Sequence, residues 1–259
     1  MLPILIQTKY LTMYTLGIFL VLALFWFLYF VWRYVRLTPH REEYVFDVII
    51  IAGLIGVIAG RIAHVLIHLR VFMETGYSTM FAIHLYPGIQ DSVAFIFTLL
   101  SAGILFSRKK IPVSLIISHL TIAFCVGMAL ASLGTLFGGT IVGTTTTLPL
   151  RIKYAGLDGL RHMIGIYQAV YYCFWAFIFH TLLMLGRHNK YLYGVMVGLM
   201  LWVFAFGKVI FLSWIEKDLL YPTVLARSVD VGLVGLLMLT GLGLLVYYLR
   251  LYVLKLHAR

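Results

Sequence analysis

The chain has 259 residues, of which 63% are hydrophobic and 11% are charged, and its mean hydropathy is +1.02. A soluble domain of this composition would aggregate, so the composition indicates a polytopic membrane protein. The formal net charge of +11 would suggest nucleic-acid binding in a soluble protein. Here the lysines and arginines lie mainly between apolar runs, where topology and anionic lipid explain them, and we expect no nucleic-acid partner.

Seven apolar segments are long enough to cross a bilayer, which takes about 20 helical residues each. The expected fold class is therefore an all-α integral membrane protein with seven transmembrane helices in a single polytopic domain, residues 1–259. The first apolar run is too long for a signal peptide, so we expect it to stay as the first span. The spans are expected near residues 11–32, 47–69, 92–107, 112–137, 165–186, 192–214 and 229–249.

The distribution of basic residues predicts the orientation, because cytoplasmic loops are enriched in lysine and arginine. With the N-terminus outside, eleven basic residues lie on the cytoplasmic side and seven on the outer side. We therefore expect the N-terminus outside and the C-terminus in the cytoplasm. The one long connection, residues 140–164, then lies outside. Connections of this length are usually functional or disordered, so it is either a cover over a site or a linker.

Two cations interrupt the apolar spans, Arg61 in the second and Lys208 in the sixth. Both lie about 21–24 Å from the cytoplasmic end of their span, which places them in the outer half of the membrane. A charge at such depth costs at least about 2.5 kcal/mol, so it should face protein, water or an anion. Asp91 and Asp230 fall at span ends, which leaves a phospholipid phosphate as the expected anion. The alternative is two side chains that reach separate headgroups and never meet.

A stripe of small residues shares the second span with Arg61. Ala52, Gly56, Gly60, His64 and His68 follow one another every four residues, so they lie on one helix face. Small residues let a second helix approach closely. The two histidines have a spacing that could bind a metal, but a third ligand is not visible. Packed or hydrogen-bonded histidines are the favoured interpretation, and no metal or cofactor is expected.

Polar residues cluster where the fifth span begins. If the chain is helical from Arg161, then Arg161, Gly165, Gln168 and Tyr172 share one face that could point into the bundle. His162 could move a proton near neutral pH. The alternative is an interfacial belt, since arginine and tyrosine both favour headgroup level. The candidate contacts to a lipid headgroup at this level are Ser132, Tyr167 and Gln168, beside Arg61, His64 and His68 of the second span.

The Arg-His-x-x-x-x-Tyr motif at residues 161–167 resembles the Arg-His-Pro-Ser-Gln-Leu-Tyr-Glu signature of the prolipoprotein diacylglyceryl transferase family. Residues 60–66, GRIAHVL, are similar to that family's Gly-Arg-x-Gly-Tyr-Val-Leu segment. Residues 193–199, with Phe206-Gly207-Lys208 after them, are similar to its Gly-x-x-x-Gly-Leu helix, which ends in an essential arginine. Seven spans with the N-terminus outside also match, and the similarity covers roughly residues 47–249.

The resemblance breaks in the fourth span. The family's run Gly-Arg-Leu-Gly-Asn-Phe-Ile-Asn-Gly-Glu falls on residues 131–140, which keep the leucine and two glycines. The arginine, both asparagines and the glutamate are lost. The family's catalytic histidine would fall near Asp91 or Ser92. These departures put the identity of the general base in doubt, and His64 and His162 are the two candidates.

The resemblance implies transfer of the diacylglyceryl group of phosphatidylglycerol to a lipobox cysteine thiol, with release of glycerol phosphate, in the bacterial cytoplasmic (inner) membrane. Arg161, His162 and Lys208 are the candidate catalytic residues. The implied partners are an anionic phospholipid and a lipobox-type protein substrate. The alternative is a catalytically inactive lipid-binding or scaffold subunit of a membrane complex, for which the partner is another membrane protein. A transporter or receptor is the third class.

Overall fold

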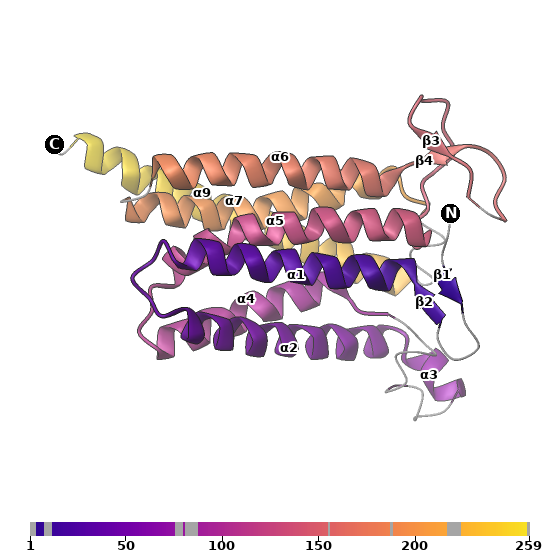
Figure 1. Ribbon diagram of the computed structural model, residues 1–259, viewed down its shortest axis with the longest axis horizontal. Coiled ribbons are helices and arrows are strands. Elements are labelled where there is room, and N and C mark those ends of the chain that lie inside the picture. Colours follow the sequence, from indigo (N-terminus) through magenta and orange to yellow (C-terminus); the bar gives the residue numbers. More distant parts are fainter. Residues whose placement is uncertain are drawn as a thin grey trace. The chain divides into compact units, whose positions relative to one another are not determined.

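The computed structural model of the chain describes residues 4–7, 12–75, 80, 88–154, 156–186, 189–216 and 224–257 (Figure 1). Seven of its helices are long and apolar enough to cross a membrane, which confirms the expected all-α membrane fold class. The orientation of the termini stays a prediction. The seven helices are α1 (Thr15–Val35), α2 (Glu42–Ile67), α4 (Asp91–Arg108), α5 (Val113–Gly138), α6 (Ile164–Leu185), α7 (Lys190–Leu212) and α9 (Val224–His257).

Short elements lie between and before these helices. Helix α3 (Leu69–Thr75) follows α2 directly. Strands β1 (Ile4–Gln7) and β2 (Thr12–Tyr14) form an antiparallel pair before α1, and β3 (Arg151–Ile152) pairs antiparallel with β4 (Arg161–His162) before α6.

Three helix starts differ from the predicted ones by four or five residues. Residues 12–14 pair in the first sheet, so α1 begins after them. Helix α2 begins early, at Glu42, because acidic residues in a first turn are stabilised by the positive end of the helix dipole. Helix α9 also begins early, at Val224, and its first turns include the charged side chain of Arg227.

The chain divides into two compact units, each with its own packing. The first unit contains Met1–Leu37, Ser114–Leu220 and Leu237–Arg259. The second contains Thr38–Val113 and Tyr221–Leu236. Helix α9 therefore contributes its first part to the second unit and the rest to the first.

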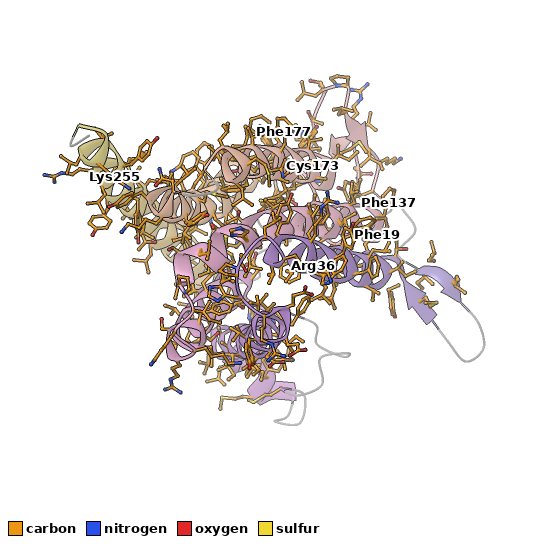
Figure 2. All side chains as sticks on the ribbon, turned by 60° about the vertical axis from the view of Figure 1, so that its left-hand side comes forward. Phe19, Arg36, Phe137, Cys173, Phe177 and Lys255 are labelled. Atoms are coloured by element: carbon orange, nitrogen blue, oxygen red, sulfur yellow. The ribbon has the colours of Figure 1, made fainter. Side chains whose placement is uncertain are left out.

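Glycines and aromatic rings hold the helices of the first unit together. The rings of Phe19 in α1 and Phe137 in α5 stack with centroids 5.3 Å apart, and both side chains are labelled in Figure 2. A Cβ at Gly134 would lie 2.6 Å from the Cβ of Phe19, so only glycine admits this ring. In α7, a Cβ at Gly198 would lie 2.9 Å from the carbonyl oxygen of Gly241 in α9. Close helix crossings of this kind depend on missing side chains.

The small-residue stripe of α2 faces α4 within the second unit. A Cβ at Gly56 would lie 2.7 Å from the carbonyl oxygen of Ala94 and would overlap the side chain of Thr98. A Cβ at Gly60 would lie 2.9 Å from the Cβ of Ala94. Ala52 is completely buried. The prediction that this stripe receives a closely packed helix is confirmed.

Large apolar side chains also cover the outside of the spanning helices. Val21 in α1 and Phe177 in α6 are each 68% exposed, and Leu239 in α9 is 71% exposed. Such surfaces suit hydrocarbon rather than water. Cys125 is a buried free thiol and Cys173 is an exposed one.

Candidate functional site

The Arg161–His162 motif lies in strand β4 and not in a helix. β4 pairs with β3, and the backbone N–H of His162 also donates to the carbonyl of Thr144 over 3.1 Å. These backbone groups are used in pairing, so α6 begins only at Ile164. The expectation of a helix from Arg161 is wrong for this reason. The residues that remain on α6 without Arg161 are Gly165, Gln168 and Tyr172.

Arg161 forms a partly buried ion pair with Glu216, beyond the end of α7. Its Nη1 lies 3.0 Å from Oε2 of Glu216, and the two side chains are 12% and 34% exposed. The same Nη1 donates to the carbonyl of Gly143 over 3.1 Å, and Nε donates to the carbonyl of Asp158 over 3.4 Å. Partial burial makes this pair less screened than a surface pair. The arginine is therefore fixed in one orientation.

His162 is enclosed by two aromatic side chains. Its ring stacks on Trp214, with centroids 5.9 Å apart and planes inclined by 21°. Its Nδ1 lies 3.4 Å from the hydroxyl of Tyr167, and that hydroxyl donates to the carbonyl of Leu150 over 2.8 Å. The histidine is only 8% exposed. A titratable ring next to a fixed guanidinium is a suitable pair for proton transfer beside an anion.

Tyr154 is a buried side chain next to strand β4. It is 3% exposed, and its hydroxyl donates to the carbonyl of Ile141 over 3.2 Å and lies 3.5 Å from the carbonyl of His162. Burial raises the pKa of Tyr154 despite the nearby charge of Arg161, so the hydroxyl stays a neutral donor. A Cβ at Gly143 would lie 2.5 Å from the carbonyl oxygen of His162, so the strand needs glycine there.

The connection of residues 140–164 folds onto the end of α7. The N–H of Thr144 donates to the carbonyl of Trp214 over 2.8 Å, and the N–H of Glu216 donates to the carbonyl of Val142 over 2.9 Å. A disordered linker is therefore the wrong description of its described residues, while a cover over the site stays a prediction. The apolar cluster beneath this contact contains Ile164, Phe211 and Ile215.

Three other predicted residues of the first unit lie on its helices. Ser132 in α5 is 4% exposed, and its hydroxyl donates to the carbonyl of Met128 over 2.7 Å. The amine of Lys208 in α7 lies 6.0 Å from the ring centroid of Phe204. Gln168 in α6 is partly buried. Their contact with a lipid headgroup or phosphate stays a prediction.

Arg61 is buried in the second unit, with 9% exposure. Its Nε and Nη2 donate to the carbonyl of Met80 over 3.2 and 3.0 Å, and Nη1 donates to the carbonyl of Gly88 over 2.9 Å. The guanidinium also lies 5.5 Å from the ring centroid of Phe72. Arg61 thus fixes two points of the chain between α3 and α4.

The two histidines of α2 lie side by side. The ring centroids of His64 and His68 are 4.4 Å apart, and Nδ1 of His68 lies 2.9 Å from the carbonyl of His64. The ring of His64 packs directly on Gly88. The packed and hydrogen-bonded interpretation is confirmed for this pair. Within the described ranges, no three His, Cys, Asp or Glu side chains gather as a metal ion would need.

Asp230 is a buried carboxylate, and its burial and hydrogen-bond partners were not visible in the sequence. It is 4% exposed, and it accepts hydrogen bonds from Ser92 Oγ over 2.6 Å and from Gln90 Nε2 over 3.0 Å. The sequence places Asp230 near a span end, and in the structure it lies about 9 Å from the start of α9 at Val224.

The structure brings some predicted site residues together within each unit. In the first unit His162 contacts Tyr167, and Arg161 directly precedes His162 in β4. In the second unit His64 contacts His68. The meeting of Arg61 with Lys208 stays a prediction. Glu216 and Trp214 are additional residues of the Arg161–His162 site, and nothing in the local sequence pointed to them because Glu216 is 55 residues from Arg161.

Comparison with known proteins identifies the family. A family model described as prolipoprotein diacylglyceryl transferase matches residues 3–248. Two curated relatives are phosphatidylglycerol–prolipoprotein diacylglyceryl transferases of Tropheryma whipplei strains. The TW08/27 relative is 31% identical over 150 residues and the Twist relative is 29% identical over 147. Each match covers 53% of this chain and 53% of the relative, so the chain spans about half the length of either. Because the family model matches nearly the whole chain, the chain belongs to the prolipoprotein diacylglyceryl transferase family.

Proposed function

We propose that this protein transfers the diacylglyceryl group of an anionic, phosphatidylglycerol-like phospholipid to the thiol of a lipobox-type cysteine, at the outer leaflet of the bacterial inner membrane. The observation that carries the proposal is the family match over residues 3–248, which includes every spanning helix except the last turns of α9. The Arg161–His162 motif lies within the matched region. The geometry around that motif supports the same activity.

The chemistry needs a cation for the leaving group and a base for the thiol. The thiol sulfur attacks the glyceryl carbon that carries the phosphate, the carbon–oxygen bond to the phosphate breaks, and glycerol phosphate leaves with the electron pair. The leaving phosphate gains one negative charge in this step. A preoriented guanidinium is most useful where charge develops, which favours Arg161 for this role. Arg61 and Lys208 are the other candidate cations.

His162 is the better candidate for the base. It lies next to Arg161 in β4, so a thiol that attacks a phosphate-bearing carbon near Arg161 would come close to the imidazole. Histidine takes up a proton near neutral pH, as this step requires. The phosphate must compete with Glu216 for Arg161, and an arginine fork binds a phosphate as well as a carboxylate.

The alternative function is a catalytically inactive lipid-binding or scaffold subunit with the same fold, and one observation favours it. The family's arginine and first asparagine of the fourth span fall on Ser132 and Thr135. The hydroxyl of Ser132 donates to the carbonyl of Met128, and that of Thr135 donates to the carbonyl of Ser132 over 2.8 Å. Both hydroxyls are therefore directed at their own helix instead of at a substrate.

One assay separates the two functions. Purified full-length protein is mixed with acyl-labelled phosphatidylglycerol and a lipobox peptide, and the labelled thioether product is measured across a range of pH. We expect product from the wild type and none above background from His162→Gln. Phosphatidylglycerol that co-purifies with the protein, together with no transfer at any pH, would establish the inactive alternative.

A further inference from the structure

We propose that the hydroxyl of Tyr167 fixes the tautomer of His162, with the ring proton on Nδ1 and the lone pair on Nε2. Tyr167 is then a positioning residue that acts through His162, in place of the headgroup contact that its sequence position suggested. Which nitrogen carries the lone pair follows from the contacts alone. Its use, to take the thiol proton, rests on the proposed function.

The tautomer follows from a count of protons at the Tyr167 hydroxyl. A phenol has one proton to donate. The carbonyl of Leu150, 2.8 Å away, can only accept, so the proton lies on that side. The phenol oxygen can then only accept from His162 Nδ1, 3.4 Å away. A neutral imidazole has a single N–H, so Nε2 of His162 is left with the lone pair.

The ring of His162 is also held in one plane. Trp214 stacks on it at 5.9 Å, and the Tyr167 ring lies edge-on at 5.9 Å with planes inclined by 67°. Tyr167 and Trp214 contact each other at 5.8 Å, which closes a triangle of three rings. The backbone of His162 is fixed by its bond to Thr144. Rotation of the imidazole, which would exchange the two nitrogens, therefore needs all three rings to move.

The structure offers a matched control in a second tyrosine. The hydroxyl of Tyr154 also lies near His162, but it is 3.5 Å from the backbone carbonyl and not from a ring nitrogen. Its removal should leave the tautomer unchanged. Arg161, which precedes His162 in β4, pairs with Glu216, and neither tyrosine belongs to that ion pair.

The test is ¹⁵N NMR of full-length protein with labelled histidine in detergent micelles. The spectra are recorded at a pH above which the His162 signals no longer change, because only a neutral imidazole shows which nitrogen carries its single proton. The chain has nine histidines, so the His162 signals are assigned by their loss in His162→Gln. We expect wild-type His162 to be protonated at Nδ1. Tyr167→Phe should shift it toward the Nε2-protonated tautomer, and Tyr154→Phe should match the wild type.

Several outcomes decide the proposal. Wild-type His162 protonated at Nε2, or a Tyr167→Phe variant of unchanged melting temperature with an unchanged tautomer, overturns it. In the transfer assay, loss of one hydrogen bond should lower the kcat of Tyr167→Phe about five-fold with KM unchanged. A tautomer shift in a wild type that transfers no lipid would support the positioning role and contradict only the proposed function.

Discussion

Two arginines with little exposed surface, Arg161 and Arg61, are held in different ways. Arg161 in β4 donates to a carboxylate, that of Glu216, as well as to carbonyls. Arg61 in α2 donates three hydrogen bonds to the carbonyls of Met80 and Gly88. An anionic partner can be exchanged for another anion, such as a phosphate. Main-chain carbonyls cannot be exchanged without moving the segment to which they belong.

The comparison separates a role in chemistry from a role in architecture. Arg161 lies beside His162, and under the proposed function it exchanges Glu216 for the leaving phosphate of a lipid. Arg61 holds Met80 and Gly88 close to α2, and the N–H of Gln90 adds a further bond to α2 by donating to the carbonyl of Gly60 over 3.0 Å. We therefore expect substitutions at Arg161 to change activity most and substitutions at Arg61 to change stability most.

The largest expected effect is that of Arg161→Gln on transfer. Loss of a preoriented group at a developing charge lowers kcat by about 10²–10³-fold, or about 2.7–4 kcal/mol of transition-state stabilisation. The matched control is Arg151→Gln, an exposed arginine on the neighbouring strand β3, which should transfer lipid at close to the wild-type rate. Equal losses in the two variants would mean that general basic charge, and not the position of Arg161, matters.

The next largest effect is on the free energy of unfolding when Arg61 or Arg161 is replaced by lysine. Lysine cannot reproduce the fork that joins Arg61 to two carbonyls, so Arg61→Lys should lower the free energy of unfolding by about 2 kcal/mol. Arg161→Lys keeps a cation that can pair with Glu216 and should cost about half as much. Unfolding in mixed micelles with increasing denaturing detergent measures both. The reverse order would contradict the separation of roles.

A smaller effect on the free energy of unfolding tests the contact between α2 and α4. Gly56→Ala would bring a Cβ to 2.7 Å from the carbonyl oxygen of Ala94 in α4, and overpacking of this kind should lower the free energy of unfolding by about 1–2 kcal/mol. Gly53 is one turn away in the same helix, and a Cβ there meets nothing within 4 Å. Gly53→Ala should be neutral or stabilising, since alanine is the better helix former. If Gly53→Ala and Gly56→Ala have the same free energy of unfolding, α2 and α4 are not closely packed at Gly56.

The sequence was sufficient for the seven spans and the small-residue face of α2, because both depend on local composition and helical period. It was not sufficient at Arg161 and His162. There a helical spacing was overridden by pairing of β4 with β3 and by backbone bonds between residues 142–144 and the end of α7. Thr144 and Trp214 are 70 residues apart, and pairing between such distant segments has no signature in a single local window.

The missed carboxylates have a similar explanation. Glu216 follows the apolar run of the sixth span, and its partner Arg161 is 55 residues away. Asp230 was assigned to a span end because the apolar run begins there, although the helix begins at Val224. Both carboxylates lie near an end of an apolar run, and composition alone does not show that ordered structure continues past that end. Buried polar networks near such boundaries become visible only when the partners are known.

The most direct test of the central claim is an experimental structure of the protein from a lipidic mesophase that contains phosphatidylglycerol. We predict the lipid phosphate within hydrogen-bond distance of the Arg161 guanidinium, with Glu216 displaced and the imidazole of His162 facing the glyceryl carbon. A bound lipid whose phosphate lies elsewhere, while Arg161 is still paired with Glu216, would contradict the account.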